Sequence, residues 1–159
     1  MSIESGFWKR LSEPVIVSGQ QYKVVYVIDG DTFTVDAHGR EATVRMLGID
    51  TPETVDRRRQ VGCFGPQASA ASKELLFGHK VRLELNPDRE ARDKYGRTLA
   101  YVYREDGLFV NRYLIERGYA REYTYGTPYL FQTEFRLVQS SARDHHLGLW
   151  GVCKLQDHE

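Results

Sequence analysis

Short segments of alternating apolar and polar residues, separated by tight-turn residues, fill the first two-thirds of this chain of 159 residues. Residues 22–28 and 32–35 flank an Asp-Gly-Asp turn, and residues 42–49 follow a His-Gly pair that is typical of a hairpin. Residues 80–85 alternate in the same way, and residues 98–104 follow them across another turn. The pattern therefore predicts five strands joined mostly by short connections.

Three helices account for most of the remaining chain. The first is expected to begin at Pro66 and to stop at Gly78. The second covers residues 109–117, and the third runs from near Pro128 to Gly148, with apolar residues spaced four, three and four apart. Strands with short turns, combined with these helices, predict an α+β fold in which a small antiparallel barrel is capped by helices.

The composition favours a single folded domain with a balanced charge. Hydrophobic residues make up 41% of the chain, enough to form a core. Lys and Arg number 22, as do Asp and Glu, so a polyanionic partner must meet a local basic patch rather than a basic protein. No run of residues approaches the about 18 apolar residues that span a bilayer. We expect no membrane-spanning segment, and nothing in the sequence requires more than a monomer.

Acidic residues stand beside turns at the ends of two predicted strands. Asp29 and Asp31 lie in the first turn, and Asp50 stands three residues before Glu53. Each group alone is more often a structural turn, because Asp, Gly and Pro are common turn residues. If the fold brings the groups together, the repulsion between carboxylates requires protein cations or a metal. Only oxygen donors are available there, so the metal would be calcium or magnesium.

Two arginines occupy positions that suit phosphate binding. Arg45 lies in a strand-like apolar segment, where an unpaired charge is costly, and Arg97 ends a turn. Taken alone, the more common interpretations are an internal salt bridge between Arg45 and an aspartate, and a solvated turn arginine at position 97. The functional alternative is a pair of guanidinium groups that contact a phosphate shared with the metal.

Four motifs occur together and in order: VIDGDT at 27–32, RMLGIDTPET at 45–54, GPQAS at 65–69 and DKYGR at 93–97. With them, the chain resembles the staphylococcal nuclease family of calcium-dependent, sugar-nonspecific nucleases from Tyr22 to Trp150. The resemblance implies Ca²⁺ as cofactor and DNA and RNA as substrates, with water attacking phosphorus to leave 3′-phosphate ends. The expected fold class is α+β, a five-stranded antiparallel OB-fold β-barrel with three α-helices.

The resemblance also implies domain boundaries and metal ligands. We expect an N-terminal extension over residues 1–20, the nuclease-like domain over 21–153 and a C-terminal tail over 154–159. Asp31 and Asp50 are implied as direct calcium ligands together with the Thr51 carbonyl, and Asp29 as an outer-shell residue. Glu53, also in the outer shell, would orient or deprotonate the attacking water.

Further residues are implied as contacts to the substrate. Arg45 and Arg97 would hold the phosphate and neutralise the charge that builds up in the five-coordinate transition state. Residues 56–62, with three consecutive arginines, resemble a loop of the family and are either a solvated surface or a basic rim that contacts substrate. Lys94 resembles a phosphate-contacting lysine. The residues that resemble nucleotide-binding tyrosines are Tyr95, Tyr123 and Tyr125.

The chain has two cysteines, Cys63 and Cys153, which are either two buried thiols or one disulfide. A disulfide would close a loop of about 90 residues and contribute on the order of 4 kcal/mol on the chain-entropy model. A disulfide and a calcium site both suit a secreted or extracytoplasmic protein, although the sequence shows no export signal.

Two rival functions remain at this point. The first is a catalytically weak or inactive nuclease-like module that binds nucleic acid, and the second is a structural or interaction domain on the same barrel. The joint presence of the acids and both arginines favours the enzyme, because neither rival gives a reason for that combination.

Overall fold

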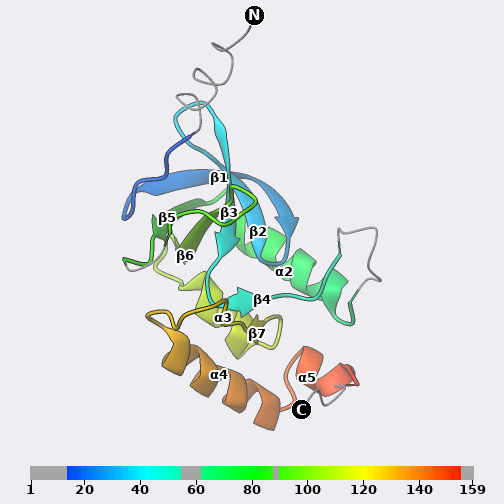
Figure 1. Ribbon diagram of the computed structural model, residues 1–159. Helices are drawn as coiled ribbons and strands as arrows, with labels where there is room; N and C mark the ends of the chain where they lie inside the picture. Colours follow the sequence, from blue (N-terminus) through cyan, green and yellow to red (C-terminus); the bar gives the residue numbers. More distant parts are fainter. Residues whose placement is uncertain (1–13, 55–61, 88–89, 155–159) are drawn as a thin grey trace, which may run out of the picture.

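The computed structural model describes residues 14–54, 62–87 and 90–154 of the chain. Its centre is a closed barrel with the strand order β1-β2-β3-β6-β5 (Figure 1). The strands of this barrel are β1 (Gln21–Asp29), β2 (Thr32–Asp36), β3 (Glu41–Met46), β5 (Lys80–Glu84) and β6 (Thr98–Arg104). The predicted five-stranded barrel of the OB-fold type is confirmed.

The pairing within the barrel is mixed rather than wholly antiparallel. β3 runs parallel to β6, with Val44 opposite Thr98, and this pairing corrects the antiparallel prediction. The other pairings, β1 with β2, β2 with β3, β5 with β6 and β1 with β5, are antiparallel. The chain between β3 and β6 contains a helix and two strands, so it is long enough for the crossover that parallel neighbours need.

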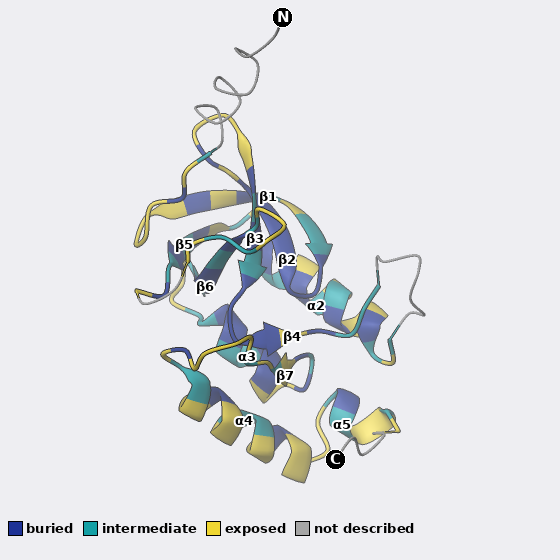
Figure 2. Cartoon of the chain, viewed as in Figure 1, coloured by how far each residue is buried: buried dark blue, intermediate teal, exposed yellow. Residues whose placement is uncertain are grey.

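Side-chain alternation separates the barrel core from its surface. Over residues 21–24 of β1, exposed and buried residues alternate, as the bands of colour at the start of this strand show (Figure 2). In β3 the side chains of Ala42, Val44 and Met46 are buried, whereas Thr43 and Arg45 on the opposite face are only partly covered. Arg45 therefore projects from the outer face of the barrel and not into its core.

The described ranges contain the three predicted helices and one further helix of a single turn. They are α2 (Gly65–Leu76), α3 (Val110–Glu116), α4 (Gln132–Asp144) and α5 (Leu149–Val152). The third predicted helix ends at Asp144 instead of continuing to Gly148, and Gly148, with a positive φ of 53°, separates α4 from α5. Figure 1 shows α3, α4 and α5 at one end of the barrel, while α2 lies beside the strands.

A small second ladder places one acidic turn. The strand predicted over 42–49 is interrupted after Met46, and its continuation is the two-residue strand β4 (Ile49–Asp50). β4 pairs antiparallel with β7 (Arg121–Glu122), which puts Asp50 opposite Arg121. The ladder fixes the position of Asp50 through the α3–α4 connection, since its partner Arg121 lies between those two helices in the chain.

Cys63 and Cys153 form a disulfide, with their Cα atoms 5.9 Å apart, so the disulfide interpretation of the two cysteines is confirmed. Cys63 stands two residues before α2, and Cys153 directly follows α5. The bond therefore links the start of the helix beside the barrel to the last helix of the described chain.

Residues 14–20 of the predicted extension lie on the barrel. The Gly19 amide donates to the Leu83 carbonyl over 2.8 Å, and the Arg92 guanidinium donates to the Pro14 carbonyl over 2.6 Å. The boundary between extension and domain at residues 20 and 21 stays a prediction. Within the three described ranges, no helix is long and apolar enough to cross a membrane.

Candidate active site

Asp31 occupies the turn between β1 and β2, where the fold brings it against Thr51. The amide and the hydroxyl of Thr51 both donate to Asp31 Oδ2, over 2.9 and 3.1 Å. Gly30 makes this approach possible, because a Cβ at position 30 would lie 2.7 Å from the Thr51 hydroxyl oxygen. The hydroxyl of Thr32 donates to the other carboxylate oxygen of Asp31 over 2.9 Å. Asp31 is therefore a buried carboxylate held at both oxygens.

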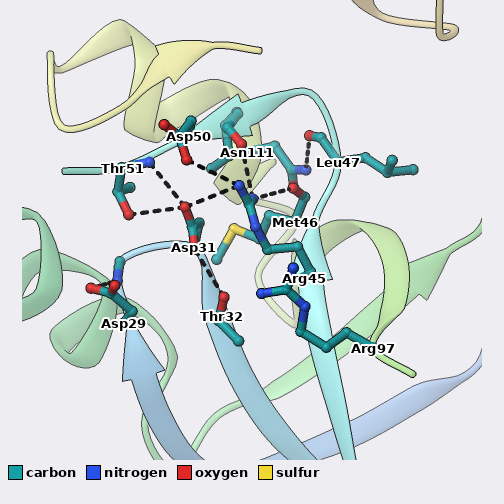
Figure 3. Close-up of polar contacts among 12 residues, drawn as sticks. Asp29, Asp31, Thr32, Arg45, Met46, Leu47, Asp50, Thr51, Arg97 and Asn111 are labelled. Atoms are coloured by element: carbon teal, nitrogen blue, oxygen red, sulfur yellow. Dashed lines mark hydrogen bonds and ion pairs between the residues drawn. The ribbon is translucent and has the colours of Figure 1, made fainter. Parts of the chain in front are cut away.

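Arg45 joins Asp31 to Asp50. Its Nη2 atom lies 3.3 Å from Asp31 Oδ2 and 3.2 Å from Asp50 Oδ1 (Figure 3). Its Nη1 atom donates to the carbonyls of Met46 and Ile49, both over 2.9 Å. The interpretation of Arg45 as an internal salt bridge thus describes the protein without ligand. The two carbonyl bonds keep the guanidinium in place independently of the carboxylates.

Asp29 lies beside this pair and is held separately. Its Oδ1 atom accepts a bond from the Gly30 amide over 2.8 Å and a second from the Thr54 hydroxyl. Burial raises the pKa of Asp29, and these two bonds oppose the rise because they favour the charged form. The sequence motifs assign no role to Thr54, although its hydroxyl contacts Asp29.

Asp50 is more open than the other two aspartates. Its side chain is 56% exposed, whereas that of Asp31 is 8% exposed. The pKa of Asp50 is raised, first by desolvation and then by the neighbouring Asp31 carboxylate, while Arg45 opposes the rise. We call Asp29, Asp31, Arg45, Asp50 and Thr51 the acid side of the site.

Glu53 is half-buried at the edge of the acid side. Its carboxylate raises the pKa values of both Asp29 and Asp50, so it lies within electrostatic reach of each. Its carbonyl accepts a bond from the Gly62 amide over 2.8 Å, which joins its segment to the chain just before α2. The arginine-rich stretch predicted as part of a loop over 56–62 lies outside the described residues, apart from Gly62.

Arg97 approaches the acid side from the turn before β6. Asp93 shapes this turn: its Oδ1 accepts from the Arg97 amide over 2.9 Å, and its Oδ2 accepts from Arg97 Nε over 2.7 Å. Since Arg45 pairs with Leu99 in the parallel ladder, Arg97 stands two residues away on the same outer face. The guanidinium of Arg97 points toward that of Arg45 (Figure 3). The DKYGR motif contains Asp93 but assigns it no role; the structure shows that it orients the Arg97 side chain.

The other residues implied as substrate contacts form an exposed margin, which we call the aromatic rim: Lys94, Tyr95, Tyr123 and Tyr125. Lys94 Nζ lies 5.1 Å from the centre of the Tyr95 ring, and Tyr95 is 72% exposed. The rings of Tyr123 and Tyr125 lie 6.4 Å apart. The Tyr123 amide donates to the Gly48 carbonyl over 2.9 Å, which places this part of the rim next to β4.

The donor atoms of the acid side have the chemistry that a hard cation requires. Among the described residues, no cluster of three or more His, Cys, Asp or Glu side chains forms a metal site by itself. The carboxylates of Asp31 and Asp50 nevertheless converge on one cationic atom, Arg45 Nη2. Carboxylate and carbonyl oxygens are the ligands that calcium prefers. The two carboxylates of Asp31 and Asp50 therefore have the donor chemistry that a divalent cation requires.

Together these groups can act on a phosphodiester. Converging carboxylates can hold a cation that binds a phosphoryl oxygen, and two guanidinium groups on the same face can neutralise further negative charge. A third acid, Glu53, lies within electrostatic reach of Asp29 and Asp50. Exposed aromatic rings at the margin offer stacking surfaces for bases.

Comparison with known proteins gives one family and close relatives. The family described as staphylococcal nuclease homologue matches residues 43–152. A thermonuclease from Staphylococcus hyicus is 42% identical over 131 residues, covering 82% of this chain and 76% of the relative. A thermonuclease from Staphylococcus intermedius is 42% identical over 134 residues, covering 84% and 78%. Endonuclease YncB from Bacillus subtilis (strain 168) is 41% identical over 139 residues, covering 84% and 65%.

Proposed function

Because the chain belongs to the family of staphylococcal nuclease homologues, we propose that it is a calcium-dependent, sugar-nonspecific endonuclease that hydrolyses DNA and RNA to 3′-phosphate ends. Family membership supports nuclease activity itself. The observation that carries the finer proposal is the convergence of Asp31 and Asp50 on a single atom of Arg45, with Thr51 against Asp31. This is the arrangement in which a divalent cation and a guanidinium can share one phosphate.

Asp31, Asp50 and the Thr51 carbonyl would hold the calcium ion, with Asp29 and Glu53 in the outer shell. When bound, calcium would polarise a phosphoryl oxygen as a Lewis acid and bring water close to phosphorus. Asp29 would help to keep the acid side ordered, since Thr54 and the Gly30 amide fix its carboxylate. Asp31 keeps its orientation through Thr32 and Thr51.

Arg45 and Arg97 would stabilise the charge that develops on the equatorial oxygens during attack. Arg45 needs no carboxylate to stay in position, because its Nη1 is held by two backbone carbonyls. Arg97 is positioned by Asp93 through its Nε, which leaves its terminal nitrogens for a phosphate. Donors fixed before the reaction stabilise the transition state without reorganisation.

Glu53 would orient the attacking water or accept its proton, after which the 5′ oxygen leaves and the phosphate stays on the 3′ side. Lys94, Tyr95, Tyr123 and Tyr125 would bind the nucleotides on either side of the reacting phosphate.

The disulfide between Cys63 and Cys153 supports a secreted or extracytoplasmic setting, because such bonds persist in oxidising compartments. We propose that the protein acts as a monomer.

The test is a cleavage assay on heat-denatured DNA and on RNA, with calcium and with a chelator, followed by analysis of the product ends. Cleavage that requires calcium and leaves 3′-phosphates on both substrates is the expected result. Binding of nucleic acid without cleavage under any metal would instead favour the alternative, an inactive nuclease-like binding module. Cleavage that persists in chelator would remove calcium from the proposal.

A further inference from the structure

Two arginines lie against the ring of one tryptophan where β7, α4 and α5 meet. The Arg121 guanidinium lies 5.4 Å from the centre of the Trp150 ring, and that of Arg143 lies 5.1 Å from it. Arg121 and Arg143 are exposed, and Trp150 is half-buried. We call Arg121, Trp150 and Arg143 the arginine–tryptophan surface. Its members come from β7, α5 and α4, so only the folded chain brings them together.

A close backbone contact fixes this arrangement. The Leu149 amide donates to the Gly118 carbonyl over 2.9 Å, just before β7 and at the start of α5. A Cβ at Gly148 would lie 2.2 Å from the Gly118 carbonyl oxygen, and a Cβ at Gly118 would lie equally close to the Leu147 carbonyl oxygen. Only glycine permits this approach. It holds Trp150 against Arg121, so the position of the surface is set by the backbone.

The arginine–tryptophan surface is continuous with the acid side. Arg121 stands directly opposite Asp50 in the β4–β7 ladder, and residues opposite each other in an antiparallel pair project to the same face. Figure 1 shows β4 and β7 side by side, with α5 beyond them. Tyr123 of the aromatic rim follows β7 immediately. A strand that reaches Asp50 can therefore continue over Arg121 toward Arg143.

This surface brings two positive charges together in a protein whose net charge is zero. Several other arginines pair with carboxylates: Arg104 with Asp106, Arg112 with Glu116 and Glu134, and Arg136 with Glu122. Within residues 14–54, 62–87 and 90–154, neither Arg121 nor Arg143 has such a partner. Because the net charge of the chain is zero, contact with a polyanion depends on local cations of this kind.

We propose that the arginine–tryptophan surface binds the phosphate backbone of a single-stranded polynucleotide, several nucleotides away from the bond that is cleaved. The proposal rests on the proposed function, since the strand is taken to be the substrate. Arg121 and Arg143 contact phosphates as point cations, and Trp150 holds both guanidinium groups in place. Exposed tyrosines of the aromatic rim offer stacking to the intervening bases, the combination that binds single strands without sequence preference.

Arg143→Gln is the main test, because Arg143 is the member of the surface on the helix remote from Asp50. Binding is measured by fluorescence anisotropy in a Glu53→Gln background with calcium, using labelled DNA strands of about 3 and about 12 nucleotides, a range based on known single-strand site sizes. The matched control is Arg112→Gln, which removes the same charge from an arginine that is already paired. Thermal unfolding of each variant reports on folding.

The expected result is weaker binding of the longer strand by several-fold, with unchanged binding of the shorter one. The slope of log affinity against log salt should fall by about 0.7 for the longer strand, the value for one phosphate contact to a single strand. Arg143→Lys, which retains the charge, should restore this slope. Arg112→Gln should change neither strand. A role of Arg143 in folding alone would alter thermal unfolding but not the salt slope.

Three results would overturn the proposal: an unchanged salt slope in Arg143→Gln, equal weakening of short and long strands, or the same loss in Arg112→Gln. Each is independent of cleavage. If the wild-type protein showed no nuclease activity but the salt slope still fell in Arg143→Gln, the proposed function would fail while the binding surface stood. If the wild-type protein cleaved short and long substrates but the salt slope were unchanged in Arg143→Gln, the proposed binding surface would fail while the proposed function stood.

Discussion

The acid side of the site and its aromatic rim differ in how far the protein buries their side chains. Asp31 is 6% exposed, and both its oxygens accept bonds from neighbouring residues. Tyr95 is 72% exposed and Tyr125 is 62% exposed. In the proposed mechanism, the groups that would face developing charge are thus fixed in advance, whereas the groups that would meet variable bases are exposed to solvent. We expect substitutions on the acid side to lower turnover, and those on the rim to weaken binding.

Glu53→Gln should have the largest effect. The amide keeps the shape of the side chain but cannot accept a proton, so turnover should fall by about 10²- to 10⁴-fold. The measurement is kcat on denatured DNA with saturating calcium, alongside the free energy of unfolding, which should change little. An unchanged kcat would exclude Glu53 from the mechanism.

Arg97→Gln and Arg45→Gln should each lower kcat by about 10²- to 10³-fold, because each removes a donor to the transition state. The two variants should differ in their free energy of unfolding. Arg45→Gln leaves the buried Asp31 carboxylate without its cation and should also lower the free energy of unfolding, whereas the more exposed Arg97 should not.

Arg104→Gln is the matched control for Arg97, because Arg104 also pairs with an aspartate near a turn but lies away from the acid side. It should keep full activity. A similar loss of kcat in Arg104→Gln would show that the effect of Arg97→Gln reflects general charge rather than a local contact.

Replacing both cysteines, Cys63→Ser with Cys153→Ser, should lower the free energy of unfolding by about 2–4 kcal/mol, measured in urea. The double variant avoids a reactive single thiol. The Gly62 amide bonds the Glu53 carbonyl next to Cys63, so we also expect a moderate loss of kcat. Wild-type protein treated with a reductant should behave in the same way; equal stability of oxidised and double-variant protein would contradict the prediction.

Tyr125→Leu should have the smallest effect and should act on binding. Loss of one stacking ring costs about 1–3 kcal/mol of binding free energy, which should appear as a higher KM with little change in kcat. Tyr26→Leu is a suitable control, since Tyr26 is 61% exposed but lies on β1 outside the rim. A fall in kcat with unchanged KM would show that Tyr125 contributes to turnover and not to substrate binding.

The barrel could be predicted because alternation with a period of two marks its strands. The same alternation could not distinguish the parallel β3–β6 pair, since parallel and antiparallel strands alternate alike. The strand predicted over 42–49 is interrupted by a turn at Gly48, which has a positive φ of 76° and packs so closely on Tyr129 that a Cβ would lie 2.5 Å from its ring. Helix α5 is a single turn, too short to produce a helical period.

The sequence motifs could identify the residues of the site, but they could not predict how those residues contact one another. The strings around Asp31 and Asp50 could be read, but the bond from Thr54 to Asp29 joins positions 25 residues apart and has no local signal. The pairing of Asp93 with Arg97 did have a local signal, because an acid and a base stand four residues apart in the sequence. The stacking of Arg121 and Arg143 on Trp150 appears only when β7, α4 and α5 meet.

The cysteine pair has a consequence for the order of events during biosynthesis. Its two sulfur atoms are separated by 90 residues of chain, and the intervening part includes β5, β6, α3 and α4. A ribosome must release all of these before the second thiol exists outside the tunnel. The bond can therefore form only after the whole barrel and the helices that follow it have been synthesised. Until then Cys63 has no partner thiol in the chain, because Cys153 is the only other cysteine.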